Sequence, residues 1–129
     1  QQVMDTYDVV FEPMAMEYLG ALSKAISNAK EEDIETKEAN NAMTAPVMLL
    51  KANASLFKFD LIGNLANVML SFLESVKKLD SDAISIVEAH HRTLTAIIVK
   101  KMKGDGGAFG KQMEEELKQA CKRYYARGA

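Results

Sequence analysis

The chain has 129 residues, of which 48% are hydrophobic and 26% charged, and its formal net charge is −2. This length and composition are typical of one globular domain, here residues 1–129, rather than of a disordered or fibrous chain. A slightly acidic chain presents no basic field for nucleic acid or anionic lipid, and no apolar run approaches the length that spans a membrane. The single cysteine, Cys121, excludes an intramolecular disulfide and suits a reducing compartment, so we expect a cytoplasmic protein.

Apolar residues recur every three or four positions along most of the chain, a spacing that predicts amphipathic helices. The first stripe consists of Phe11, Met14, Tyr18, Leu22 and Ile26. The polar run 28–41 then predicts a connection with room for a helical turn or more. A second helix is expected to start at Thr44-Ala45-Pro46, because proline is tolerated in the first helical turn. Its stripe consists of Val47, Leu50, Ala54 and Phe57.

Three further helices are expected in the second half of the chain. Asp60 is expected to cap the third helix, and the Asp80-Ser81-Asp82 run to start the fourth, where the helix dipole favours carboxylates. Glycines between positions 104 and 107 separate the fourth helix from the last one. The apolar stripes of the three helices are, in order, Ile62, Leu65, Ala66, Met69, Phe72, Leu73 and Val76; Ile84, Val87, His91, Leu94 and Ile98; and Phe109, Met113, Leu117, Cys121 and Tyr124.

No segment alternates with a period of two for long enough to predict a strand. The expected fold class is therefore all-α. The expected architecture is an antiparallel four-helix bundle with an additional terminal helix.

One segment of the second helix carries a specific pattern, Met48-Leu49-Leu50-Lys51-Ala52-Asn53-Ala54-Ser55-Leu56-Phe57. It resembles the signature of histidine phosphotransfer (Hpt) domains, in which His-x-Leu-Lys-Gly is followed by small residues and an aromatic residue. Lys51 matches the lysine of this signature. Met48 stands where the family has its histidine, and Ala52 stands where it has glycine. The resemblance covers positions 14 to 79.

The resemblance implies a signalling role in a two-component phosphorelay. In the family, the exposed imidazole takes a phosphoryl group from a receiver aspartate and passes it on. A thioether forms no stable phosphorylated product, so the resemblance implies a domain that is not an enzyme, has no cofactor and carries no phosphate. Its partner would be the receiver domain of a response regulator or a histidine kinase. The implied binding residues are Met48, Lys51, Ala52, Ser55 and Lys58.

The helical period predicts the orientation of this site. Position 48 lies about 100° around the helix from the buried position 47 and shares a face with Lys51, Ala52 and Ser55. We therefore expect Met48 to be exposed to solvent at the middle of its helix.

Two alternatives stay open. The chain is either a structural or oligomerising helical bundle without a phosphorelay role, or a domain with residual phosphotransfer through His90 or His91. The two adjacent histidines point about 100° apart and are poorly placed to share one metal ion. His91 lies on the apolar stripe, where a partly buried histidine with a hydrogen-bond partner is the usual outcome. Cys121, also on an apolar stripe, is expected to belong to the core.

Overall fold

The computed structural model describes residues 6–31, 36–100 and 107–126, and these residues form five helices and no strand. The predicted all-α class is confirmed. None of these helices combines the length and the hydropathy needed to traverse a lipid bilayer. The helices are α1 (Thr6–Glu31), α2 (Thr36–Leu56), α3 (Asp60–Ser75), α4 (Ser81–Val99) and α5 (Gly107–Ala126).

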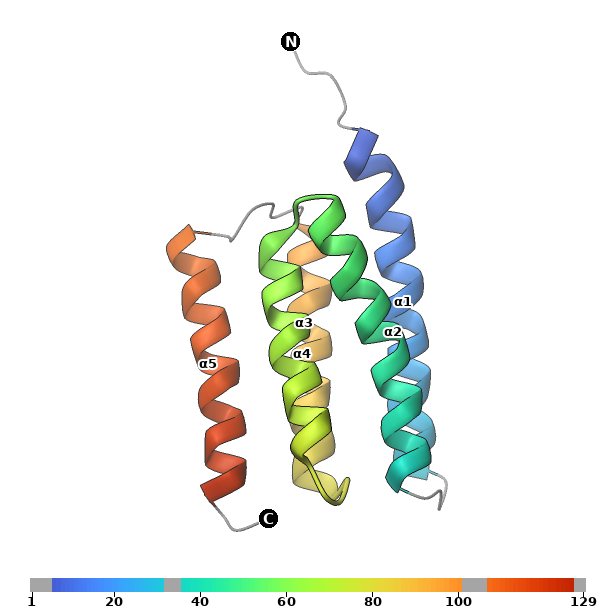
Figure 1. Ribbon diagram of the computed structural model, residues 1–129, viewed down its shortest axis with the longest axis vertical. Coiled ribbons are helices and arrows are strands. Elements are labelled where there is room, and N and C mark those ends of the chain that lie inside the picture. Colours follow the sequence, from blue (N-terminus) through green and yellow to red (C-terminus); the bar gives the residue numbers. More distant parts are fainter. Residues whose placement is uncertain (1–5, 32–35, 101–106, 127–129) are drawn as a thin grey trace.

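Consecutive helices run in opposite directions along a common long axis (Figure 1). α2 packs against α1 and α3, while α4 also packs against α1 and α3, so α1 to α4 form a closed ring around one core. α5 lies outside this ring and packs on α3 and α4. In this arrangement α2 keeps one side free of other helices.

All five helices contribute to the core, and the seven predicted apolar positions of the third stripe are all buried, six of them in α3 and Val76 at its C-cap. Burial of so many branched and aromatic side chains is the main stabilising term of a domain of this size, at about 25 cal/mol per Å² of apolar surface. At one end of the four-helix ring, the aromatic side chain of Phe11 stacks on that of Phe59, with 4.4 Å between the ring centroids. It also contacts Phe57, with 5.6 Å between the ring centroids. These contacts hold α1 against the turn between α2 and α3.

The predicted start of the second helix at Thr44-Ala45-Pro46 is wrong, because α2 begins at Thr36. Two buried residues, Ala39 and Met43, continue the apolar stripe upstream of Val47. Pro46 lies inside the helix, where its ring leaves the carbonyl of residue 42 without the usual helical donor. The run 28–41 is thus mostly helical, and its residues 32–35 lie outside the described residues.

The prediction that Asp60 caps α3 is wrong. Asp60 is the first residue of α3, and its carboxylate lies in the first turn. The N-cap position is Phe59, which makes no side-chain capping bond. By contrast, Asp80 caps α4 as predicted, since its carboxylate accepts a hydrogen bond from the backbone N–H of Ala83 at 2.8 Å.

The stripes of α4 and α5 also differ from expectation. His90, rather than His91, is fully buried on α4, because the buried face continues from Val87 to Leu94 through position 90. On α5, Phe109 is exposed, whereas Leu117, Cys121 and Tyr124 are buried. The predicted glycine break falls mainly on residues 104–106, which lie outside the described residues.

α2 ends in a backbone motif that places Lys58 in the left-handed region, with φ of 67°. The N–H of Phe59 donates to the carbonyl of Ala54 at 2.9 Å, and the N–H of Lys58 donates to that of Ser55 at 3.3 Å. This pair of bonds is a Schellman motif, whose left-handed position usually holds glycine. A side chain there costs about 1 kcal/mol through contact of its Cβ with the backbone.

We expect Lys58→Gly to raise the free energy of unfolding by about 0.5–1 kcal/mol, because glycine relieves the left-handed strain at this position. Urea denaturation monitored by circular dichroism measures the change. Lys58→Ala is the matched control, since it removes the ammonium group but keeps a Cβ. A glycine variant no more stable than the alanine variant would contradict the strain.

Candidate functional site

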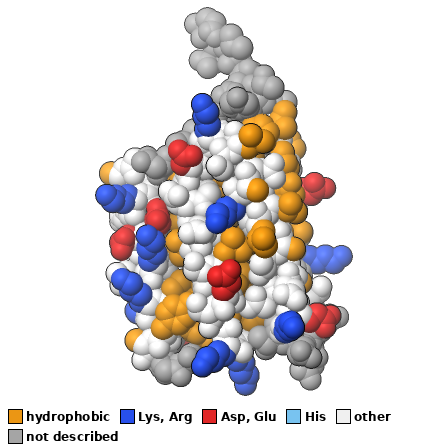
Figure 2. All heavy atoms as spheres, in the orientation of Figure 1, with side chains coloured by type: hydrophobic (Ala, Val, Ile, Leu, Met, Phe, Trp, Pro, Cys, Tyr) orange, Lys and Arg blue, Asp and Glu red, His pale blue; other side chains and the backbone are white. Residues whose placement is uncertain are grey.

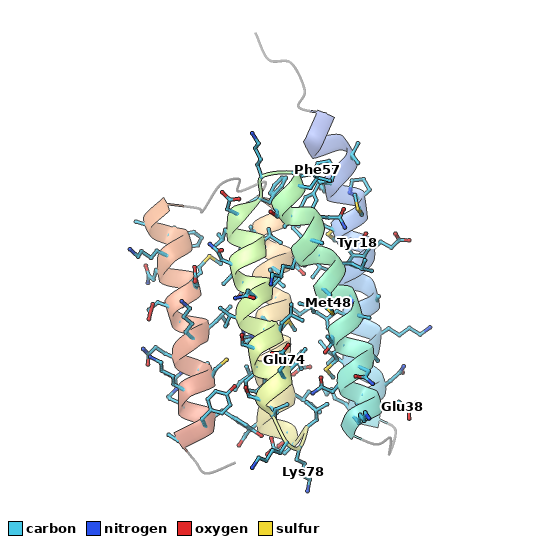
Figure 3. All side chains as sticks on the ribbon, viewed as in Figure 1. Tyr18, Glu38, Met48, Phe57, Glu74 and Lys78 are labelled. Atoms are coloured by element: carbon cyan, nitrogen blue, oxygen red, sulfur yellow. The ribbon has the colours of Figure 1, made fainter. Side chains whose placement is uncertain are left out.

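Met48 lies near the middle of α2, and 57% of its surface is exposed (Figure 3). Its exposure follows from the residues beside it, because Val47 and Leu50 are buried in the core and turn position 48 outward. The predicted exposure of Met48 is confirmed.

A groove of about 590 Å³ runs between α2 and α3, and Met48 forms part of its α2 wall. The α2 wall also contains Lys51, Ala52 and Ser55, so the structure brings together four of the five predicted binding residues. The residues of α3 that line the groove are Asp60, Gly63, Asn64, Asn67 and Leu70.

Lys51 reaches across the groove, where its ammonium group donates a hydrogen bond to Oδ1 of Asn67 at 2.9 Å. Both side chains are exposed, so this bond fixes the position of a positive charge without removing it from solvent. Ala52 on the α2 wall and Gly63 on the α3 wall are small, so little side-chain volume projects into the groove at these positions. A Cβ built on Gly63 would meet no atom nearer than Ala54 Cβ, at 4.0 Å.

The outward face of α2 beside the groove is apolar. Leu49 is 50% exposed and Leu56 is 68% exposed, and the small residues Ala42 and Ala45 continue this face toward the start of the helix. Figure 2 shows apolar side chains exposed over α2 and around the groove. Contiguous apolar surface of this kind marks sites of association more often than single exposed residues do.

Asn53 ties the other flank of α2 to α1 through one side-chain hydrogen bond, to Tyr18, and makes a second one within α2. The amide nitrogen of Asn53 donates to the hydroxyl of Tyr18 at 3.3 Å and to the carbonyl of Leu49 at 2.9 Å. The bond to Tyr18, together with the burial of Val47 and Leu50, holds the rotation of α2 and with it the direction of Met48.

Lys58, the fifth predicted residue, does not line the groove. Its backbone forms the turn after α2, and its side chain is exposed there. The structure thus places it at the end of the site rather than beside Met48.

Sequence reasoning missed the α3 wall of the groove, in particular Asn64, Asn67 and Leu70. The two amides are spaced three residues apart and fall between the buried positions of α3, so the spacing could have placed them on one exposed side. The spacing alone does not tell that this side adjoins α2.

His90 has no exposed surface, and a partner could reach its ring only if α4 separated from its neighbours. Its Nδ1 lies 2.9 Å from the carbonyl of Ile86, so this nitrogen carries the proton and donates. Its Nε2 has no hydrogen-bond partner among the described residues. Burial lowers the pKa of His90 below its usual 6.5, against the smaller opposing effect of the bond to Ile86.

His91 is half-buried, as expected, and its Nε2 lies 3.0 Å from the carbonyl of Leu19 on α1. Cys121 is buried, and burial raises the pKa of its thiol to about 11, so it is poorly suited to act as a nucleophile. Within the described residues, no three His, Cys, Asp or Glu side chains gather in a way that could hold a metal ion.

Comparison with protein-family models, with the curated proteins and with the solved structures gives no match. The site is therefore interpreted from its residues and geometry.

We expect the free energy of unfolding to fall as the pH is lowered from about 7.5 to about 5, by up to about 1.4 kcal/mol per pH unit from His90. The folded protein keeps His90 neutral because its pKa is lowered, whereas the unfolded chain takes up a proton below pH 6.5. The stability from His90 is thus present above this pH and is lost as the pH falls toward the folded pKa. Urea denaturation across this range measures it.

The matched variants for this measurement are His90→Leu and His91→Gln. His90→Leu should flatten the pH dependence, while His91→Gln should keep the contribution of His90. An unchanged slope in His90→Leu would show that His90 titrates alike in the folded and unfolded states.

Proposed function

We propose that this chain is an Hpt-like signalling domain that docks a response-regulator receiver domain through the α2–α3 groove without carrying phosphate. The observation that carries the proposal is the position of Met48. It is exposed at mid-helix, with Lys51 one turn away and the small residue Ala52 beside it. The resemblance places the family's phosphorylated histidine at this position.

The arrangement of the helices supports the proposal. The ring of α1 to α4, with α5 outside it, fits the antiparallel four-helix bundle with an additional terminal helix that the apolar stripes predict, and such a bundle is compatible with an Hpt-like domain. The site also lies on a helix held on both flanks, by α1 and by α3. A rigid site of this kind suits docking, since little ordering entropy is lost on binding.

The chemistry of the groove favours binding over group transfer. Thioether sulfur is a poor acceptor for phosphate, but the flexible methionine side chain packs well against irregular apolar surfaces. Leu49 and Leu56 add exposed apolar area, and Lys51 adds a positive charge that would attract the acidic site of a receiver. Such a domain would compete with phosphate-carrying Hpt proteins for the same receiver and would damp the relay.

We expect Met48→Glu to weaken receiver binding by about tenfold or more, because it replaces an exposed apolar side chain of the docking surface with a carboxylate that repels the acidic site of a receiver. Titration of the ¹⁵N-labelled protein with the receiver domains of the source genome measures the affinity. Val99→Glu is the matched control, since Val99 is equally exposed but lies at the end of α4. If no receiver perturbs residues 48–58, the proposed docking is wrong.

We expect Met48→His combined with Ala52→Gly to take up phosphate from a phosphorylated receiver, because these changes restore the imidazole and the glycine of the family signature. The uptake should appear as acid-labile label on the double variant and not on the unaltered protein. A double variant that binds the receiver yet takes up no label would contradict an Hpt-like geometry at this position.

The exposed apolar face of α2 also favours one alternative, an oligomerising helical bundle in which two copies bury Leu49 and Leu56 against each other. Light scattering separates the two functions. A species that stays monomeric at high concentration counts against self-association, whereas a dimer broken by Leu49→Glu supports it. The other alternative, phosphotransfer through His90 or His91, requires acid-labile label that is lost on His→Gln substitution.

A further inference from the structure

The methionines of this chain differ sharply in exposure. Met43 and Met69 are fully buried, whereas Met48 is 57% exposed. Met16, on α1, is the other strongly exposed methionine among the described residues. Met48 alone of these four lines the α2–α3 groove.

An exposed thioether reacts with hydrogen peroxide by transfer of one oxygen atom. The sulfur lone pair attacks a peroxide oxygen, the O–O bond breaks, an S–O bond forms, and the remaining oxygen leaves as water. Sulfur loses two electrons and peroxide gains them. A dithiol-dependent reductase reverses the step, giving thioether, disulfide and water.

We propose that Met48 is a reversible oxidation site whose sulfoxide closes the docking groove to its partner. This inference rests on the proposed docking function and adds its regulation. Met48, which a partner would contact in the α2 wall of the groove, is also the groove's own oxidisable group.

The contents of the groove explain why oxidation would close it. Met48 and Leu70 are the two large apolar side chains among the residues that line it. The sulfoxide is polar and a strong hydrogen-bond acceptor, so it keeps water in the groove and opposes entry of an apolar side chain. Lys51 lies on the same face one turn away, and among the described residues its ammonium group donates one of its three N–H groups, to Asn67. A second N–H is thus available to the sulfoxide oxygen.

The position of Met48 outside the core explains why the fold would tolerate the change. Oxidation of a buried methionine such as Met43 or Met69 would place a polar group among apolar side chains and destabilise the protein. Oxidation of Met48 adds its oxygen on the solvent side of α2. The modification therefore acts on binding rather than on folding.

The test treats the unaltered protein, Met48→Leu and Met16→Leu with hydrogen peroxide and removes the excess with catalase. Peptide mass spectrometry locates the sulfoxides, thermal unfolding reports the fold, and titration with a receiver domain reports binding. Leucine keeps the apolar volume of position 48 but has no sulfur. Met16→Leu is the matched control, because it removes the other exposed methionine and leaves the groove intact.

We expect Met48 to be oxidised well before Met43 and Met69, with little change in the unfolding temperature. Receiver binding should fall about tenfold or more in the unaltered protein and in Met16→Leu. In Met48→Leu, whatever its binding before treatment, the affinity should be the same before and after peroxide. In the unaltered protein, binding should return after treatment with methionine sulfoxide reductase and dithiothreitol.

Three results would overturn the inference. In the first, Met48 turns out to be oxidised no faster than the buried methionines. In the second, oxidation of Met48 unfolds the protein. Both results are measured without any partner. In the third, fully oxidised Met48 leaves receiver binding unchanged, and the docking proposal then stands while the regulation is wrong. If the untreated protein binds no receiver, the docking proposal fails first and the regulation fails with it.

Discussion

The burial of Val47, Leu50 and Ala54 is the constraint on which the site depends. These residues pack one side of α2 into the core, and the helical period then turns Met48 and Ala52 to the outside. The contacts of Asn53 with α1 and of Lys51 with α3 hold the helix at this rotation. A rotation of α2 by one residue would bury the thioether and remove the groove. The site is thus a consequence of core packing rather than of a separate loop.

In the proposed function, the groove would separate two properties that the Hpt family combines, recognition of a partner and acceptance of phosphate. Recognition needs shape, apolar area and charge, and the α2–α3 groove offers all three through Met48, Leu70 and Lys51. Acceptance of phosphate needs a nitrogen that is both exposed and basic. The ring of His90 is buried, and His91 is half-buried with its Nε2 beside a backbone carbonyl. These positions are in keeping with the proposed docking function, in which the groove binds a partner and carries no phosphate.

The sequence predicted the helices and the exposed side of α2 because both follow from apolar spacing. It misplaced the start of α2, since Ala39 and Met43 are isolated among polar residues and Pro46 suggested a first turn. The apolar spacing placed His91, rather than His90, on the buried stripe of α4. The side chains of these two neighbours point about 100° apart, and either one extends a stripe of period 3.6. The α3 wall, with Asn64 and Asn67, depends on which helices become neighbours, and this information lies in the packing of the whole ring.

Docking of a partner on the groove around Met48 is tested most directly through the NMR signals of the methionine methyl groups. The protein carries eight methionines, and ¹³C-methyl labelling makes each a separate NMR probe. On addition of a receiver domain, we expect the Met48 methyl signal to shift or broaden, while those of the buried Met43 and Met69 stay in place. Equal changes at all three methyl groups, or a change confined to Met16 on α1, would contradict docking at this groove.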